Sequence, residues 1–150
     1  NDKYNLKMKN ILVNEAYTDF WAIILNSYLI CAIQNKGFYD FNDLLHKEIK
    51  FINYQSNKIL ALTTSNTNIN KYTHIFSYYI LKNELFQSIN TILEYSYNNN
   101  VQFIKINNLD EFIDLLLSIK KPHIRKIKNT DTKLYETMKM SFNSIDIFKN

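Results

Sequence analysis

The sequence predicts an all-α protein, an up-and-down bundle of four long helices. Two observations favour this class. Apolar residues recur at helical spacing over several long stretches. The chain of 150 residues also has only one glycine and one proline, whereas folds rich in tight turns need many residues that tolerate positive φ. Asparagine is abundant and also tolerates positive φ. The shortage of glycine therefore argues against an all-β fold but does not exclude it. No linker or internal repeat is visible, and we expect a single domain over residues 1–150.

The stretch Asp19–Ile33 organises the predicted bundle. It contains the only tryptophan, Trp21, and it shows almost no polar face, which predicts burial on most sides. We expect one helix over about residues 3–34. Lys36 and Gly37 would end it, with the glycine in the left-handed conformation that commonly follows a helix.

The remaining elements follow in order. A second helix begins at Asp40 or Asn42, both able to cap a helix, and runs to about residue 57. A third covers about residues 70–97, a short one begins at Asn108 and ends near residue 119, and a last one runs from residue 130 toward 148. On the second helix, Lys47, Glu48, Lys50 and Lys58 lie opposite the apolar stripe and are expected to face solvent.

An α/β three-layer fold with a small parallel sheet remains the alternative. Its strands would be Phe20–Leu25, Lys58–Thr63 and Val101–Ile106. The last of these alternates apolar and polar residues with period two, which is typical of a half-buried strand.

Two resemblances accompany these two folds. As a bundle, the chain resembles in composition the secreted helical bundles of malaria parasites, such as the sporozoite cell-traversal protein, because it is rich in Asn, Lys, Ile and Tyr. As a sheet protein, its residues 56–64 (SNKILALTT) resemble the second strand of the von Willebrand A-type domain of the small TFIIH subunit, and residues 100–117 resemble the last strand and helix of such domains. The metal-binding Asp-x-Ser-x-Ser motif of classical members would fall near Asn26, and it is absent.

The sequence carries no catalytic signature, and we expect a protein that is not an enzyme and needs no metal or cofactor. His46, His74 and His123 are far apart, without partners at the spacing of a helical metal site. The acids Asp110 and Glu111 are explained by a helix N-terminus, which attracts negative charge. The single glycine excludes a glycine-rich phosphate loop.

Two features bear on partners. The basic segment 120–128 (KKPHIRKIK) could contact an anionic surface, and its candidate contact residues are Lys120, Lys121, Arg125, Lys126 and Lys128. The polar residues Asn26, Ser27 and Ser77 fall inside helical stripes and are candidates for a buried polar core, either paired or marking a core that opens. The net charge of +4 comes almost entirely from lysine, so we consider nucleic acid an unlikely partner.

These observations predict a non-enzymatic interaction protein that binds a protein partner or an anionic membrane. The resemblance to the malaria-parasite bundles implies a secreted protein that acts at host-cell membranes during cell traversal. The resemblance to the TFIIH subunit implies instead a structural subunit of a nuclear transcription and repair assembly. The longest apolar run is broken by Asn26 and Ser27 and is shorter than a bilayer span, so we expect no transmembrane span. Secretion is slightly favoured over the nucleus.

Overall fold

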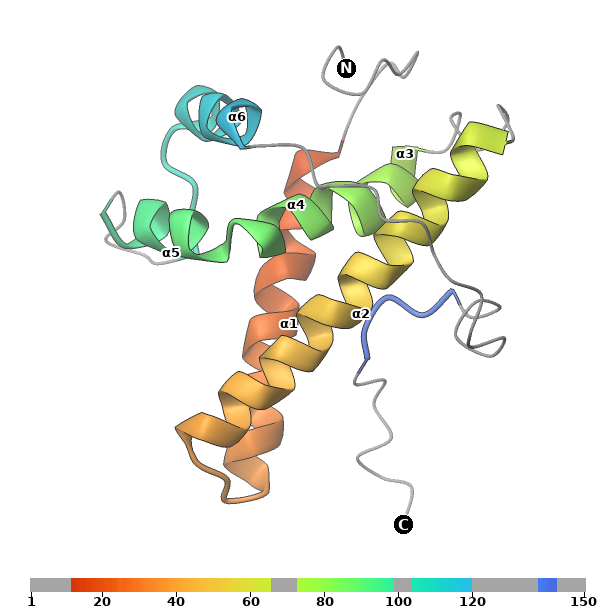
Figure 1. Ribbon diagram of the computed structural model, residues 1–150. Helices are drawn as coiled ribbons and strands as arrows, with labels where there is room; N and C mark the ends of the chain where they lie inside the picture. The colour runs from red at the N-terminus through yellow and green to blue at the C-terminus, as the bar shows by residue number, and fades with distance from the viewer. Residues whose placement is uncertain (1–11, 66–72, 99–103, 120–137, 143–150) are drawn as a thin grey trace.

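The fold is all-α, as predicted. The computed structural model describes residues 12–65, 73–98, 104–119 and 138–142 (Figure 1). All regular secondary structure in these ranges is helical, and the helices pack as a bundle. The α/β alternative is not supported. Residues 20–25 and 58–63 lie inside long helices, and residues 104–106 form a turn and irregular backbone.

Helix α1 (Val13–Ile33) is the first arm of a helical hairpin. It ends where Asn35 adopts a left-handed conformation with φ of 51°, and the Lys36 N–H donates to the Cys31 carbonyl at 2.8 Å. The prediction that Gly37 takes this position is wrong, because Gly37 has no positive φ. Asparagine tolerates the left-handed region better than other residues with a side chain.

Helix α2 (Phe38–Ser65) is the second arm and returns alongside α1. Its start is fixed by Asp40, whose Oδ2 accepts a hydrogen bond from the Gly37 N–H at 3.0 Å. An acid in the first turn that reaches back in this way completes one half of a capping box. Asp40 therefore caps the start of α2, as predicted. It does so from within the first turn and not as the residue that precedes the helix.

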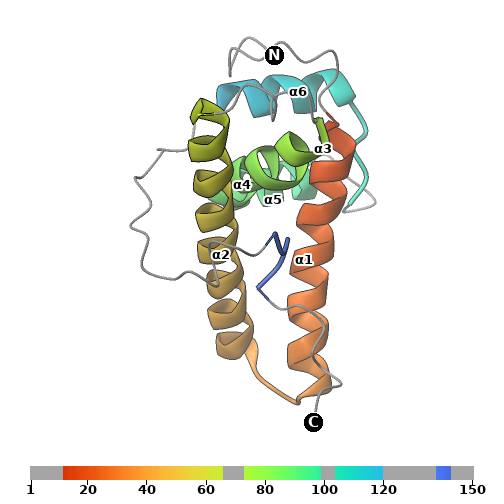
Figure 2. The same ribbon diagram turned by 90° about the vertical axis from the view of Figure 1, so that its right-hand side faces the viewer.

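A third helical run crosses the hairpin instead of lying alongside it (Figures 1 and 2). It consists of α3 (Thr73–Ile75), the π-helix η3 (Phe76–Leu81), α4 (Lys82–Gln87) and α5 (Ile89–Asn98). At Ser88, between α4 and α5, the backbone leaves the helical region with φ of −117° and ψ of 28°. The single helix predicted over residues 70–97 is thus helical in its described part but interrupted twice.

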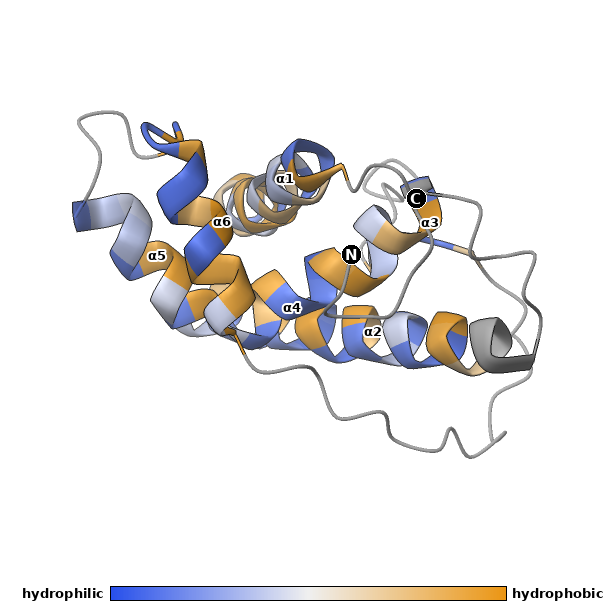
Figure 3. Cartoon of the chain, turned by 90° about the horizontal axis from the view of Figure 1, so that it is seen from above, coloured by the Kyte–Doolittle hydropathy of each residue, from blue (hydrophilic) through white to orange (hydrophobic). Residues whose placement is uncertain are grey.

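Among the described residues, the most completely buried segment is the junction of η3 and α4. All eight residues from Tyr79 to Phe86 are buried, including Lys82, Asn83 and Glu84. Figure 3 shows that apolar residues (orange) and polar residues (blue) alternate along both α2 and α4. We expected Asp19–Ile33 to be buried on most sides, and this is wrong for its second half. The crossing run covers only the half of α1 that lies away from the hairpin turn (Figure 1).

Helix α6 (Leu109–Ser118) packs against the start of α1 and against α5. Asn108 caps it as predicted, since its Oδ1 accepts hydrogen bonds from the N–H groups of Asp110 and Glu111. Phe112 anchors it, with its ring centroid 5.0 Å from that of Tyr17 and 5.5 Å from that of Tyr95.

The last predicted helix is only partly described. Residues 138–142 are not helical, which contradicts the prediction over that range, and the remainder of residues 130–148 lies outside the described residues. This short segment (blue) lies beside α2 in Figure 1 and appears in front of the space between α1 and α2 in Figure 2. Side chains of α2, η3 and α4 hold its main chain there. We call residues 138–142 the strap.

Candidate functional site

The turn end of the hairpin carries a group of exposed apolar side chains. Leu25, Leu29 and Ile33 recur every fourth residue on the outer side of α1, and Phe38 and Tyr39 begin α2. Tyr39 is 89% exposed and Phe38 71%. Large apolar side chains gathered in this way on a folded surface mark a site of interaction. We call Leu25, Tyr28, Leu29, Ile33, Phe38 and Tyr39 the hairpin tip.

A pocket opens within the hairpin tip. It has a volume of about 350 Å³ and is lined by Tyr28, Cys31, Ala32, Lys36, Gly37, Phe38 and Phe41. The Phe41 ring lies 6.4 Å from Tyr28 and 6.2 Å from Phe38, between centroids. Apart from Lys36, the side chains in this lining offer mainly apolar surface. The pocket therefore suits an apolar group.

Helix α1, which carries most of the hairpin tip, is also long and apolar enough to cross a membrane by length and composition. A core helix of a soluble protein passes the same test. Here α1 packs against α2, η3 and α4, so this property adds only weak support for a membrane role.

A buried charged pair joins the crossing run to α1. The Lys82 ammonium donates to the Asp19 carboxylate at 2.7 Å, and the Lys82 side chain is 1% exposed. Burial lowers the pKa of Lys82 below its ordinary value of 10.5, while the charges of Asp19 and Glu48 act in the opposite direction. Desolvation is the largest of these effects, because a charged ammonium loses its water here.

The same lysine and a neighbouring tyrosine bind the main chain of the strap. Lys82 Nζ donates to the Met140 carbonyl at 2.8 Å. The Tyr79 hydroxyl donates to the Met138 carbonyl at 2.6 Å, and burial raises the pKa of Tyr79 above its ordinary value of 10.0. Two carbonyls of the strap are therefore held by donors on η3 and α4.

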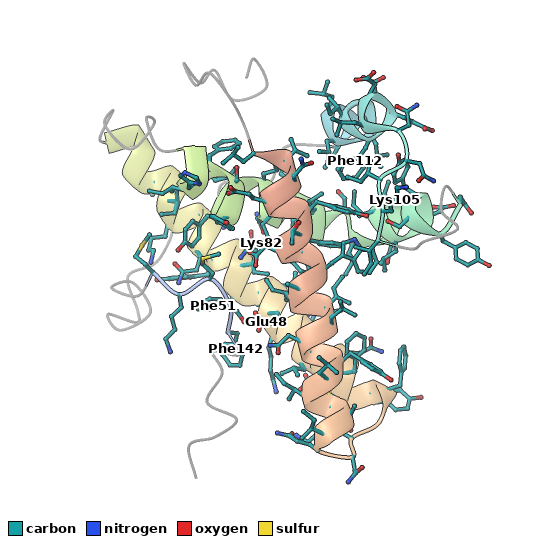
Figure 4. All side chains as sticks on the ribbon, turned by 180° about the vertical axis from the view of Figure 1, so that it is seen from behind. Glu48, Phe51, Lys82, Lys105, Phe112 and Phe142 are labelled. Atoms are coloured by element: carbon teal, nitrogen blue, oxygen red, sulfur yellow. The ribbon has the colours of Figure 1, made fainter. Side chains whose placement is uncertain are left out.

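Glu48 of α2 binds the far end of the strap. Its carboxylate, in a residue 1% exposed, accepts the Ser141 hydroxyl at 2.6 Å and the Phe142 N–H at 2.8 Å. The Phe142 ring meets that of Phe51 at a centroid distance of 6.2 Å. Figure 4 shows Glu48, Phe51, Lys82 and Phe142 grouped in this region. We call Glu48, Phe51, Tyr79 and Lys82 the strap site.

The predicted buried polar core is partly correct. Ser27 and Ser77 are fully buried, whereas Asn26 is only half-buried. Ser77 Oγ accepts the Leu12 N–H at 3.2 Å, but Ser27 Oγ has no hydrogen-bond partner within the described ranges. Within the described ranges, no hydrogen bond joins two of these three residues, so they do not form one polar site.

The predicted anionic-surface contact cannot be placed. Lys120, Lys121, Arg125, Lys126 and Lys128 all lie outside the described residues. The basic segment therefore stays a prediction.

The described residues offer little for metal or acid–base chemistry. Among them, no group of three His, Cys, Asp or Glu side chains could hold a metal ion. His46 is exposed, and His74 Nδ1 lies 3.4 Å from the Glu15 carboxylate on the surface. Asp110 and Glu111 occupy the first turn of α6, at the helix N-terminus that the sequence predicted for them.

The groups that the sequence did not reveal are those of the strap site and the hairpin tip. Glu48 and Lys58 were expected to face solvent, and both are 1% exposed. The spacing of apolar residues did not indicate this burial. Helical spacing predicts which residues share a face, but it does not predict which other segments cover that face. Tyr79 falls on the apolar stripe of the third predicted helix and is buried as that stripe predicts, at 6% exposed. Neither its hydroxyl nor Lys82 gave a local sign of contact with the strap.

An uncharacterised protein of Acanthamoeba polyphaga mimivirus is 31% identical to the chain over 165 residues, which cover 96% of this chain and 42% of the mimivirus protein. The chain thus spans less than half the length of that relative. No protein-family model matches the chain, and no solved structure matches it. The name of the relative describes no activity, so function is inferred from the geometry of the sites.

Proposed function

We propose that the chain is a non-enzymatic interaction protein that docks on an anionic membrane surface through the hairpin tip. The observation that carries the proposal is the exposure of six large apolar side chains at one end of the helical hairpin, Leu25, Tyr28, Leu29, Ile33, Phe38 and Tyr39. Transfer of such side chains from water into an apolar medium contributes about 1.5–3 kcal/mol for each one that becomes fully buried.

The chemistry of the hairpin tip favours a membrane interface. Tyrosine has an apolar ring and a polar hydroxyl, and it is enriched where hydrocarbon meets the lipid headgroups. Tyr28 and Tyr39 are both more than half exposed. Lys36, in the turn between the two helices, can extend its ammonium toward the headgroups while its stem lies along apolar surface. The net charge of +4 further favours an anionic surface.

A protein partner is the second candidate, and the pocket in the hairpin tip favours it. The space between Tyr28, Cys31, Phe38 and Phe41 is large enough to accept an apolar side chain of a partner. The parasite cell-traversal role and the nuclear-assembly role predicted above are not addressed by any of these observations and stay predictions.

The test is flotation of the chain with lipid vesicles. Wild type is compared on phosphatidylcholine vesicles that contain phosphatidylserine and on phosphatidylcholine vesicles alone. The double variant Phe38→Ala/Tyr39→Ala removes the two most exposed rings of the hairpin tip, and Tyr97→Ala removes a ring on α5 that is 75% exposed. We expect wild type and Tyr97→Ala to bind the anionic vesicles and the double variant to bind at least about tenfold more weakly.

Two results would oppose the membrane proposal. Wild type that stays off both kinds of vesicle would leave the protein-partner candidate as the better explanation of the exposed tip. Equal binding by wild type and the double variant would mean that another surface contacts the lipid.

A further inference from the structure

Two small residues keep the pocket in the hairpin tip open. Ala32 lies in the last turn of α1, Gly37 directly precedes α2, and both line the pocket. A Cβ atom added to Gly37 would have one neighbour within 4 Å among the described residues that do not adjoin it, Asp40 Oδ2 at 3.9 Å. Gly37 has no positive φ, so its backbone does not require glycine. The missing side chain therefore provides space at this position.

The walls of this space are aromatic and apolar. The rings of Tyr28, Phe38 and Phe41 line it, together with Cys31, which is 4% exposed. The volume of about 350 Å³ lies within the range of about 300–1,000 Å³ that is typical of pockets for small molecules. Such a lining favours an apolar chain, because the chain loses contact with water when it enters.

Lys36 adds one positive charge to the pocket. Among the described residues that line it, Lys36 is the only charged one. Its N–H donates to the Cys31 carbonyl at 2.8 Å, which fixes the backbone from which the lysine side chain extends. Asp40, in the first turn of α2, does not line the pocket and already accepts the Gly37 N–H. An apolar space with one cation matches a ligand that has a long apolar chain and one anionic end.

We propose that the pocket binds a straight-chain fatty acid. The acyl chain lies among the aromatic rings, and the carboxylate pairs with the Lys36 ammonium. This proposal rests on the membrane role proposed for the hairpin tip, because a membrane supplies such a ligand. It adds a specific ligand to a surface that otherwise contacts lipid only through exposed side chains.

The test measures the binding of decanoate to the full chain by isothermal titration calorimetry, without vesicles. Hexanoate carries the same carboxylate on a shorter chain, and each methylene moved out of water changes affinity by about fourfold. We expect decanoate to bind at least about tenfold more tightly than hexanoate. Lys36→Gln should weaken decanoate binding by up to about fivefold, as expected for an exposed ion pair. It should leave the binding of uncharged decanol unchanged.

Cys31 reports where decanoate binds. It is the only cysteine in the chain, and it lines the pocket. Bound decanoate should therefore shield it from the small thiol reagent methyl methanethiosulfonate. At a concentration ten times its dissociation constant, decanoate should slow this reaction about tenfold.

A variant that fills the pocket separates this proposal from membrane docking. Ala32→Trp places a large side chain in the pocket but keeps Phe38 and Tyr39. Ala22→Trp is the matched control, because Ala22 is also exposed on α1 but does not line the pocket. Ala32→Trp should bind decanoate at least about tenfold more weakly, since the new ring clashes with the chain. Ala22→Trp should match wild type, and both variants should still float with anionic vesicles.

Thermal melting checks the folding of these variants. If Ala32→Trp does not melt cooperatively, Gly37→Leu is the second filling variant, because the φ of Gly37 accepts a side chain. If neither variant folds, the small residues are required for packing of the hairpin, and the proposal is overturned.

The remaining outcomes are also distinct. The proposal is overturned if decanoate does not bind wild type, and the apolar side chain of a partner protein is then the better occupant. It is also overturned if decanoate leaves the Cys31 reaction unchanged, or if the folded filling variant binds decanoate as tightly as wild type. Decanoate binding by a wild type that does not float would instead contradict membrane docking and support a site for free fatty acid.

Discussion

Lys82 Nζ lies 2.7 Å from Asp19 Oδ2 in a pair whose lysine is 1% exposed. A second pair in the same protein, Lys47 with Asp43, has the same 2.7 Å separation, but its side chains are 53% and 67% exposed. The two pairs differ mainly in their access to water. The exposed Lys47–Asp43 pair therefore serves as a reference for the effect of burial on the Lys82–Asp19 pair.

Removal of Asp19 should destabilise the fold strongly. Asp19→Ala leaves the buried Lys82 ammonium without its carboxylate, and loss of one partner of a buried pair typically costs about 3–5 kcal/mol. Asp43→Ala should change stability little, because exposed pairs are screened by water. Urea unfolding of both variants measures the difference, and equal effects would contradict the description of the Lys82 pair as buried and interdependent.

The same lysine should make stability depend on pH. Burial lowers the pKa of Lys82 in the folded protein, so the unfolded chain binds its proton more tightly. Stability then rises with pH as the pH approaches the ordinary lysine value of 10.5. The raised pKa of Tyr79 has the opposite effect above pH 10.0, where the unfolded tyrosine ionises first.

Lys82→Met isolates this effect, because it lacks the ionisable group and is otherwise of similar length. Wild type should gain stability relative to Lys82→Met as the pH rises toward 10. The measurement is a series of urea unfolding curves at increasing pH, all below 10. A difference between the two proteins that does not change with pH would show that the Lys82 pKa is not lowered.

The two buried serines should respond to alanine in opposite directions. Ser77 Oγ accepts the Leu12 N–H, so Ser77→Ala should lower the free energy of unfolding by about 1 kcal/mol. Ser27 Oγ has no partner within the described ranges, so Ser27→Ala should raise it by about 1 kcal/mol. Thermal melts of both variants provide the check. A loss of stability in both would mean that Ser27 also has a hydrogen bond.

Trp21 should contribute strongly to stability. It is 4% exposed and packs edge-on against Tyr17 and Phe20, which confirms its predicted burial. Trp21→Ala should cost about 3–5 kcal/mol, whereas Tyr97→Ala, at an exposed position on α5, should cost far less. Denaturant unfolding compares the two. In the native protein, a tryptophan emission maximum at the wavelength of free tryptophan in water would contradict burial.

The helices were predictable from the sequence, because apolar spacing and end residues such as Asn108 act locally. The direction of the third run was not predictable, since a break at Ser88 and a π-helix over residues 76–81 carry no strong composition signal. The exposure of Phe38 and Ile33 was also missed. An apolar residue indicates that burial would be favourable, but only the three-dimensional packing decides whether another element covers it.

The strap site was missed for a related reason. Glu48 lies on the polar side of its helical stripe, and a polar side usually faces solvent. The donors that make burial of the carboxylate possible come from Ser141 and Phe142 of the strap, 93 and 94 residues further along the chain. Contacts at such separations have no periodic pattern, so the sequence alone does not indicate them.

The most direct test of membrane docking places a probe in the hairpin tip. Tyr39→Trp is compared with Tyr97→Trp on anionic vesicles whose acyl chains carry bromine, which quenches tryptophan at close range. Trp21 is buried and common to both variants, so the difference between them reports the added tryptophan. We predict strong quenching of Tyr39→Trp and little quenching of Tyr97→Trp. Absence of quenching in both, or equal quenching in both, would contradict docking through the hairpin tip.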